Sequence, residues 1–433
     1  MLTVTSTIIT ALIAVTQGLP LGTNLGMLHM LWTLISGQLL KSRGALFPAL
    51  QAIGLSPPEM RRAWAALRYG SWTIDEMLVA WQKYVQEQLD WEVHRYEGYR
   101  PTAIDLTAFW RPTLKKVPGK YYHSQAGKAL PAIVLGLVGW VGHLGTQRLL
   151  LPTAIIRVDP DDPAPKTLQA RVLGQVAASL ANDEVAVLDA GFKLSELQAA
   201  GLTNYVVRLA KNFTAQRNIP AAYKGIGRHP EYGEKVRPLE RSYRDRLLEA
   251  TPPDWTTCWQ EDEETLIEVE IWEELVLNDQ KATPDNQTFR VLAFHDPRYI
   301  DPLLVATSLP LQPQSVLSIY HDRWPVEGPP LVAKQMLGAH RQFVSASESC
   351  QRLPELALLA GSILAFLAAS LPAIPTGFWD RNPLPTPGRL RRALIDLPFP
   401  ETYPLPARFR VKRSVTDHFE TGFLARKRLK RAA

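Results

Sequence analysis

Apolar runs with strand character alternate with helical patterns between residues 128 and 210, and this alternation leaves few possible folds. The runs KALPAIVLGLVGWVG (128–142) and LLLPTAIIRV (149–158) predict strands, and TLQARVLGQVAASLA predicts a helix. The strand DEVAVLDAGF, the helix KLSELQAAG and the strand NYVVRLA follow in turn. Alternation of this kind indicates the α/β class, with parallel strand pairs in the sheet.

The segments on either side of this alternation have different patterns. Up to about residue 98, apolar residues recur at helical intervals in PPEMRRAWAALRYG and in TIDEMLVAWQKYVQEQLDWEVH, whose first residue, Thr73, is the expected N-cap. After residue 211, TLIEVEIWEELVL and TFRVLAFHD are β-like runs. DPLLVATSLP then predicts a buried strand, and PQSVLSIYHDRW predicts a helix.

These changes of pattern divide the chain into five expected segments. They are a helical N-terminal domain (1–98), the first part of a core (99–212), a β-rich insertion (213–300), the second part of the core (301–345), and a C-terminal helical region with a basic tail (346–433). The 433 residues, of which 46% are hydrophobic, are enough for two or three domains.

Two apolar segments raise the question of a membrane. The first forty residues contain no Lys, Arg, Asp or Glu. However, a signal peptide needs a basic start, which MLTVTSTIIT lacks, and QGLPLGTNLG interrupts the run that a spanning helix requires. The stronger candidate is LALLAGSILAFLAASLPAI (356–374). We interpret both segments as buried helices and expect no membrane association.

Charge and cysteine content narrow the possible partners and compartment. The net charge of +6 favours an acidic partner. The two cysteines, Cys258 and Cys350, are too few for a disulfide framework or a thiolate zinc site. A reducing cytoplasm fits this cysteine usage.

Three carboxylates lie at positions that favour a role in metal binding or catalysis. Asp105 lies in an expected strand, Asp189 ends the apolar strand EVAVLDAG, and Glu327 lies far downstream. A strand end holds a functional side chain on a rigid element. Carboxylates that converge without Cys or His ligands suit Mg²⁺ or Mn²⁺, and two such ions catalyse phosphodiester displacement.

The third carboxylate belongs to the stretch YHDRWPVEGPPLVAK (320–334). Its functional residues, Tyr320, Arg323, Glu327 and Lys334, would share one face of a continuous helix. A face with one acid and several cations suits phosphate binding rather than a core. Three prolines interrupt the stretch, so we expect the helix to break locally, with a restart near Pro329, while Glu327 still reaches the other acids.

With these residues in place, the chain resembles the DDE transposases of bacterial insertion sequences. The similarity is to the cut-and-paste group with a Tyr-x2-Arg-x3-Glu-x6-Lys signature (the IS-four-type group), matched by Tyr320, Arg323, Glu327 and Lys334. It extends to Asp105 and to Asp189 in LDAGF, and covers about residues 100 to 345.

The resemblance implies a fold, a reaction and partners. The fold is an RNase H-like (retroviral integrase-like) catalytic core with a β-rich insertion. The reaction is strand cleavage and strand transfer at element ends, with Asp105, Asp189 and Glu327 as catalytic ligands of two Mg²⁺ or Mn²⁺ ions. Tyr320, Arg323 and Lys334 would bind DNA, and the helical N-terminal domain (1–98) would bind the DNA ends. The partners are double-stranded DNA, as terminal inverted repeats and target, and a second copy of the chain, in a bacterial cytoplasm and at the nucleoid when bound.

A basic stretch next to the expected core is a further candidate for DNA contact. Cations interleave with tyrosines between Arg208 and Arg246, a mixture that suits backbone tracking and base stacking. We assign DNA binding within this stretch to Arg237, Arg241 and Arg244. The family uses an aromatic of the insertion to hold a flipped base, but for Trp255, Trp259 and Trp272 packing is the default interpretation for each.

Other functions stay open at this point. The chain is alternatively a plain nuclease of the same core, or an inactive or domesticated DNA-binding protein that keeps the fold without catalysis. Such a binding protein is expected to show steep salt dependence and no response to replacement of the acids.

Overall fold

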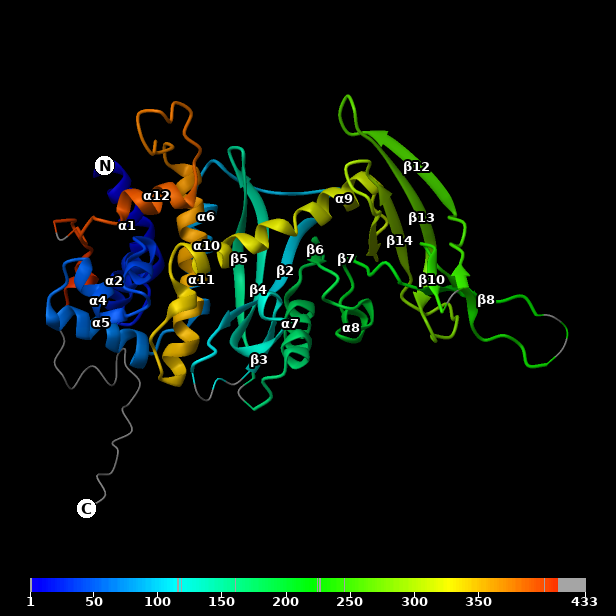
Figure 1. Cartoon of the computed structure of the whole chain (residues 1–433), viewed down its shortest axis with the longest axis horizontal. Helices are drawn as coiled ribbons and strands as arrows, with labels where there is room; N and C mark the ends of the chain where they lie inside the picture. The colour runs from blue at the N-terminus through cyan, green and yellow to red at the C-terminus, as the bar shows by residue number, and fades with distance from the viewer. Residues whose placement is uncertain are drawn as a thin grey trace, which may run out of the picture. The chain divides into compact units, whose positions relative to one another are not determined.

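The computed structural model describes residues 2–114, 117, 119–159, 161–223, 225, 227–244, 246–400 and 402–411 (Figure 1). The chain divides into two compact units. Unit 1 comprises Met1–His94, Asp105–Leu168 and Trp324–Ala433, and unit 2 comprises Arg95–Ile104 and Gln169–Arg323. Helices and a mixed sheet confirm the α/β class. Most of the basic tail lies outside the described residues.

Unit 1 begins with helices, as its periodicity predicts. These are α1 (Leu2–Thr16), α2 (Asn24–Ile35), α3 (Gln38–Lys41), α4 (Leu46–Ala52), α5 (Pro57–Tyr69) and α6 (Ile74–Gln86). Every residue of α2 except Leu25 is buried, which explains why this helix needs no polar face. The expectation of a buried helix is therefore confirmed at α2.

The start of α6 confirms Thr73 as an N-cap. The Glu76 backbone N–H donates to Thr73 Oγ1 at 3.3 Å, and the Thr73 N–H donates to Glu76 Oε2 at 3.1 Å. This reciprocal pair satisfies two N–H groups that have no acceptor within the helix.

Replacing Thr73 with alanine is expected to lower the free energy of unfolding by about 1 kcal/mol, because the Glu76 N–H loses its acceptor. Urea denaturation followed by circular dichroism measures the change. Thr73→Ser keeps the hydroxyl and is expected to unfold at the native midpoint; equal losses in both variants would contradict the capping role.

Three strands of unit 1 pair with one long strand. β1 (Trp91–Val93), β3 (Gly119–His123) and β5 (Gln147–Arg157) all pair antiparallel with β4 (Lys128–Leu144). The two apolar runs of the sequence therefore form one antiparallel hairpin, β4–β5. The short connection at Gly145, where φ is +57°, permits this direct return of the chain.

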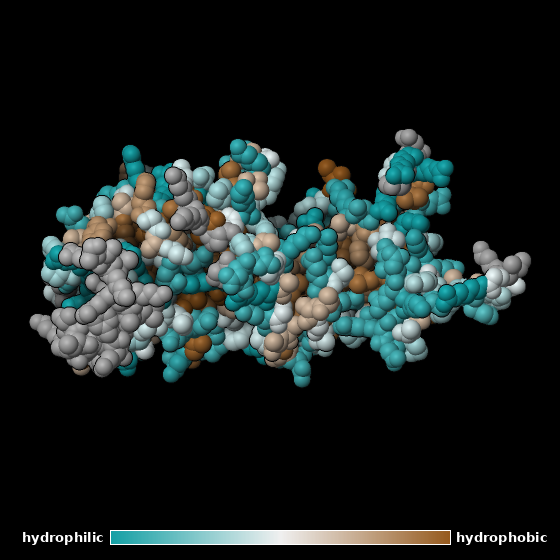
Figure 2. Space-filling model, turned by 90° about the horizontal axis from the view of Figure 1, so that it is seen from below, coloured by the Kyte–Doolittle hydropathy of each residue, from teal (hydrophilic) through white to brown (hydrophobic). Residues whose placement is uncertain are grey.

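The long helix α11 (Ser347–Ser370) is the core helix of unit 1. By length and composition it is the one helix in the described part of the chain that qualifies as a membrane span, but 83% of its most apolar window is buried. It packs against helices α2, α5 and α6 and strands β4 and β5. Figure 2 shows mostly hydrophilic side chains on the face drawn. The shorter helices α12 (Pro387–Leu394) and α13 (Ala407–Arg410) follow.

Unit 2 is built on a mixed sheet. The start of β2 (Arg100–Trp110) pairs parallel with β6 (Glu184–Leu188), which pairs parallel with β7 (Tyr205–Arg208), as the strand–helix alternation predicts. From β7 the sheet continues through antiparallel neighbours in the order β15 (Leu303–Thr307), β14 (Phe289–His295), β13 (Leu266–Leu277), β8 (Ala215–Pro220) and β9 (Gly233–Val236). β12 (Trp255–Gln260) also pairs antiparallel with β13, and β10 (Arg241–Tyr243) pairs with β11 (Arg246–Leu248) as a separate hairpin.

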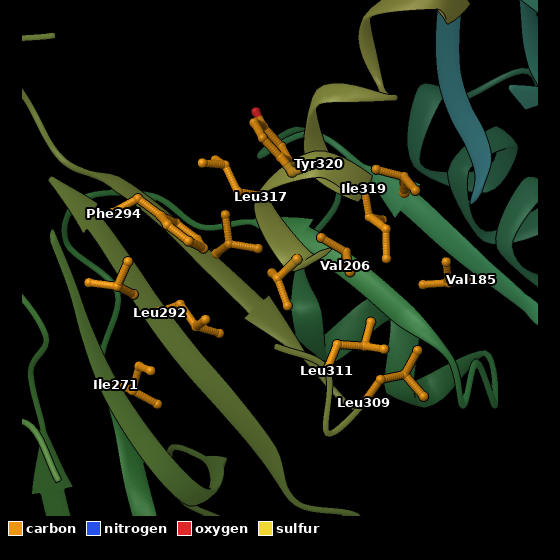
Figure 3. Close-up of a cluster of buried hydrophobic side chains, with 14 of the residues drawn as sticks. Val185, Val206, Ile271, Leu292, Phe294, Leu309, Leu311, Leu317, Ile319 and Tyr320 are labelled. Carbon is orange, nitrogen blue, oxygen red and sulfur yellow. The ribbon is translucent and has the colours of Figure 1, made fainter. Parts of the chain in front are cut away.

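One apolar core joins the parallel and antiparallel strands of unit 2 (Figure 3). Val185 and Val206 come from the parallel strands, and Leu292 and Phe294 from β14. The β-like segment after residue 211 therefore extends the same sheet rather than forming a separate one. Helices α7 (Pro165–Ser179), α8 (Leu194–Ala199) and α9 (Pro313–His321) complete the α/β pattern, and α9 packs on this core through side chains that include Ile319.

Candidate active site

The signature stretch folds as two helices. α9 ends at His321, a 3₁₀ turn covers Trp324–Glu327, and α10 spans Gly328–Gln335. The expected local break is therefore confirmed, and it lies between His321 and Gly328.

Proline chemistry explains both the break and the restart. Pro325 has no N–H to donate to the carbonyl of His321, and its ring would clash with that carbonyl, so α9 ends there. Pro329 and Pro330 lie in the first turn of α10, where backbone N–H groups have no acceptor within the helix. The restart near Pro329 is therefore confirmed. Tyr320 and Arg323 belong to unit 2, and the later signature residues belong to unit 1.

In unit 2, Asp189 has an unsatisfied carboxylate oxygen. It follows β6 directly, and its side chain is 38% exposed. Its Oδ1 atom is nevertheless buried and accepts no hydrogen bond from any described residue; Arg208 Nη1 lies 3.8 Å away, beyond hydrogen-bond distance. A buried acceptor without a donor costs free energy, so this atom is a candidate ligand of a cation.

The Asp189 carboxylate, Tyr320, Arg323 and Arg208 form one electrostatic cluster. Burial, and then the negative charge of Asp189, raise the pKa of Tyr320, while Arg323 and Arg208 lower it. The ring of Tyr320 packs in the unit 2 core, and its oxygen points away from Val206 (Figure 3). The rigid core therefore holds this phenol beside two cations and an acid.

Arg208 is a member of this cluster that the sequence interpretation did not assign. It is the last residue of β7, which lies parallel to β6. Because parallel strands end at the same edge of a sheet, the C-terminal position of Arg208 was the signal that would have identified it.

In unit 1, Lys334 lies over one face of β2. Its Nζ donates to Thr107 Oγ1 at 2.8 Å and lies 5.3 Å from the ring centre of Phe109. Burial lowers the pKa of Lys334 to about 8, and the negative charge of Asp105 opposes this shift. Asp105, Thr107 and Phe109 alternate along β2 and so share this face. Burial and the charge of Asp105 also raise the pKa of Tyr121.

The other two acids of the expected triad, Asp105 and Glu327, have environments that differ from that of Asp189. Asp105 Oδ1 accepts the backbone N–H of Leu106 at 2.8 Å. Glu327 is exposed and occupies the N-cap position of α10, although no side-chain capping bond forms. Across the described residues, no group of three His, Cys, Asp or Glu side chains is arranged to hold a metal ion. Metal binding therefore stays a prediction.

The three assigned arginines of the basic stretch lie near one hairpin. Arg241 begins β10, and Arg244 lies in the turn between β10 and β11 with a positive φ of 48°. Arg237 follows β9 and donates its backbone N–H to Thr251 Oγ1 at 2.9 Å. The Nε atoms of Arg237 and Arg241 are buried and lack a hydrogen-bond partner among the described residues.

The tryptophans of the β-rich segment differ in burial. Trp272 is fully buried, and its Nε1 donates to the carbonyl oxygens of Thr251 and Pro252, which confirms the packing interpretation for this residue. Trp259 packs partly buried against the unit 2 core. Trp255 is exposed on β12.

Comparison with known proteins adds no relative. A scan against protein-family models gives no match, and a search of curated protein sequences gives no significant similarity. The resemblance to insertion-sequence transposases therefore rests on the motif residues themselves.

Proposed function

We propose that this chain is a DNA transposase with an RNase H-like core. It cleaves DNA strands at the ends of an insertion sequence and joins them to target DNA. Its substrates are double-stranded terminal inverted repeats and the target, and it acts as a homodimer on DNA in the bacterial cytoplasm, associated with the nucleoid when bound. Asp105, Asp189 and Glu327 are its catalytic acids.

The observation that carries this proposal is the register of two parallel strands. β2 and β6 pair at a constant sequence offset, since Arg100 pairs with Glu184 and Ala103 pairs with Val187. Asp105 and Asp189 are separated by the same offset. Asp105 lies on β2, and Asp189 directly follows β6. The family that the chain resembles carries its first two acids on parallel strands, so this shared offset supports the proposal.

The donor chemistry of the three acids fits Mg²⁺ or Mn²⁺. All three supply only carboxylate oxygens, which hard cations prefer, and the buried Oδ1 of Asp189 accepts no hydrogen bond from the described residues. Two such ions would supply a nucleophile activated at neutral pH and charge stabilisation for the leaving oxygen. Asp105, Asp189 and Glu327 would hold them.

The cations of the two units bind the DNA backbone in this proposal. In unit 2, Arg323 and Arg208 attract phosphate oxygens, and the Tyr320 hydroxyl donates to a phosphate or sugar oxygen. In unit 1, Lys334 takes the same role as a point charge. Arg237, Arg241 and Arg244 contact DNA farther along the duplex.

The lowered pKa of Lys334 predicts a pH dependence of DNA binding. Lys334 is charged below pH about 8 and loses its proton above it, so the affinity of the native chain for end DNA is expected to fall about fivefold between pH about 7.5 and about 9.5. Lys334→Arg stays charged throughout and is expected to show a flat profile. Fluorescence anisotropy with labelled duplex measures both, and a parallel fall in the two proteins would assign the titration to another group.

The proposal is tested with labelled duplex that carries the ends of the element encoding the chain. Cleavage followed by joining to a plasmid, in Mg²⁺ and not in EDTA, is the expected result. Cleavage without joining would identify a nuclease. Binding of the ends without cleavage would identify the alternative function, an inactive or domesticated DNA-binding protein.

A further inference from the structure

Unit 1 contains a second cationic site, outside the acids and the signature residues. A cleft of about 490 Å³ lies between the end of β2 and the loop after α10. Its lining includes Arg43, Arg111, Arg341 and His340, together with the aromatic rings of Trp110 and Phe343. The described lining contains no carboxylate, so the cleft carries net positive charge.

Arg111 and Gln342 form the buried floor of this cleft. Arg111 Nη1 donates to Gln342 Oε1 at 3.1 Å, and Arg111 Nη2 donates to the Val344 carbonyl at 3.0 Å. Neither contact neutralises the guanidinium, and no described carboxylate forms an ion pair with it. Gln342 is only 4% exposed, yet its Nε2 has no acceptor among the described residues. A buried cation and a buried amide donor together call for an acceptor-rich ligand.

A hydrogen-bonded histidine holds Arg341 at the cleft. His340 Nδ1 donates to the Lys334 carbonyl, and its Nε2 accepts from Arg341 Nε at 3.0 Å. The neutral imidazole that this chain of bonds requires agrees with the lowered pKa of His340, which arises from burial and the nearby cations. Arg341 is thus oriented by its Nε, while its terminal nitrogens form no hydrogen bond with described residues.

Arg43 is held in a backbone conformation that favours glycine. Its φ is +55°, and the next residue, Gly44, has a φ of +90°. Gly44 packs so closely on the other loop that a Cβ would lie 1.5 Å from the Arg341 carbonyl oxygen, and its own carbonyl accepts the Phe343 N–H at 3.0 Å. The two loops are therefore fixed together, and an arginine occupies a position where its backbone is strained.

The aromatic wall of the cleft is unusually open. Phe343 is 76% exposed, so it contributes little to the core. Trp110 is half-buried and lies 5.4 Å from Lys334 Nζ, measured to its ring centre. An exposed ring beside arginines provides a stacking face next to a phosphate site.

We infer that this cleft binds an unpaired nucleotide of a DNA strand, with its phosphate between Arg43 and Arg341 and its base on the ring of Phe343. The choice of DNA rests on the proposed function, whereas the site uses none of the catalytic acids. A phosphate alone would leave Phe343 without a role, and a base inside a duplex would not expose a face to it.

The test is binding of single-stranded DNA in EDTA, where no cleavage interferes. A 3′-labelled oligothymidine of about ten nucleotides is titrated with the full chain by fluorescence anisotropy. Arg341→Glu and Phe343→Ala are each expected to weaken binding about tenfold. Arg341→Glu is also expected to reduce the slope of log affinity against log salt concentration by about 0.7 for each phosphate that the variant no longer neutralises. Arg392→Glu, the same charge change at an exposed position of α12 outside the cleft, is the matched control and is expected to bind normally.

Two further experiments are needed. One separates the contribution of the base to affinity from that of the phosphate, and the other separates a loss of binding from a loss of folding. For the native chain, an abasic oligonucleotide is expected to bind about tenfold more weakly than the intact oligonucleotide. For Phe343→Ala, the two oligonucleotides are expected to bind equally, because the ring that stacks on the base is gone. Arg43→Gly suits the positive φ, so it is expected to keep or raise the melting temperature while weakening binding.

The outcomes distinguish this inference from the proposed function. If the chain cleaves its ends but Arg341→Glu and Phe343→Ala bind single strands as tightly as Arg392→Glu does, the cleft inference alone is overturned. If free thymidine monophosphate competes as well as the oligonucleotide, the ligand is a free nucleotide and the assignment to a DNA strand is wrong. If the chain binds no DNA, both proposals fail.

Discussion

Asp189→Asn is expected to reduce DNA cleavage about 1,000-fold or more, with folding and end binding retained. The replacement keeps the shape of the side chain and removes its charge. Asp189 directly follows a fully buried strand. Its buried Oδ1 accepts no hydrogen bond from the described residues and forms only a long ion pair with Arg208 Nη1 at 3.8 Å, so we propose a metal ion as its ligand. Single-turnover cleavage of pre-bound end DNA in Mg²⁺ measures the loss.

The opposite end of the same strand offers a matched control. Asp183 precedes β6 and forms an exposed ion pair with Arg95 at 3.1 Å. Asp183→Asn makes the same chemical change away from the proposed site and is expected to cleave at nearly the native rate. The proposed role of Asp189 would be refuted by an Asp189→Asn protein that cleaves within a few-fold of Asp183→Asn. Asp105→Asn and Glu327→Gln are expected to be as inactive as Asp189→Asn.

Glu355→Gln is expected to destabilise unit 1 by about 3 kcal/mol. Glu355 is fully buried in α11, and Arg157 Nη2 of β5 donates to its Oε2 at 2.7 Å. Removing the carboxylate charge leaves the arginine without its buried partner, which costs far more than the pair itself contributes. Urea unfolding followed by circular dichroism measures the change.

The neighbouring Glu348 provides the control within the same network. It contacts both Arg157 and Arg352 but is 40% exposed, so water replaces its bonds when the carboxylate is removed. Glu348→Gln is expected to lose about 1 kcal/mol or less. Equal losses in the two variants would show that burial of Glu355 is not what makes its ion pair important.

The sequence predicted most elements of the fold because their patterns are local. The apolar runs became β4, β5, β6 and β7, and Thr73 capped α6 through side-chain chemistry that spans only three residues. The direct hairpin between β4 and β5 was not predicted, since periodicity carries no information on strand direction. The prolines predicted that the helix would break. The exact position of the break was not predicted: α9 ends at His321 because Pro325 cannot donate a hydrogen bond to the His321 carbonyl.

The candidate site was predicted less completely because parts of it depend on distant contacts. Asp189 was identifiable from its place at a strand end. Thr107 is identified only by its hydrogen bond to Lys334 in the folded chain. The arginine cleft is identified only by the packing of the Gly44 loop against the Arg341 loop. Such contacts join segments hundreds of residues apart, and no local pattern of residues encodes them.

We propose that Asp105, Asp189 and Glu327 hold the same metal ions, and iron-directed cleavage of the polypeptide measures this. Fe²⁺ bound in place of Mg²⁺, with ascorbate and peroxide, generates radicals that cut the backbone beside the ion. This shared metal site predicts cuts in β2 near Asp105, after β6 near Asp189 and at the start of α10 near Glu327, all suppressed by excess Mg²⁺ and by Asp189→Asn. Cuts confined to one unit, or unchanged in Asp189→Asn, would contradict it.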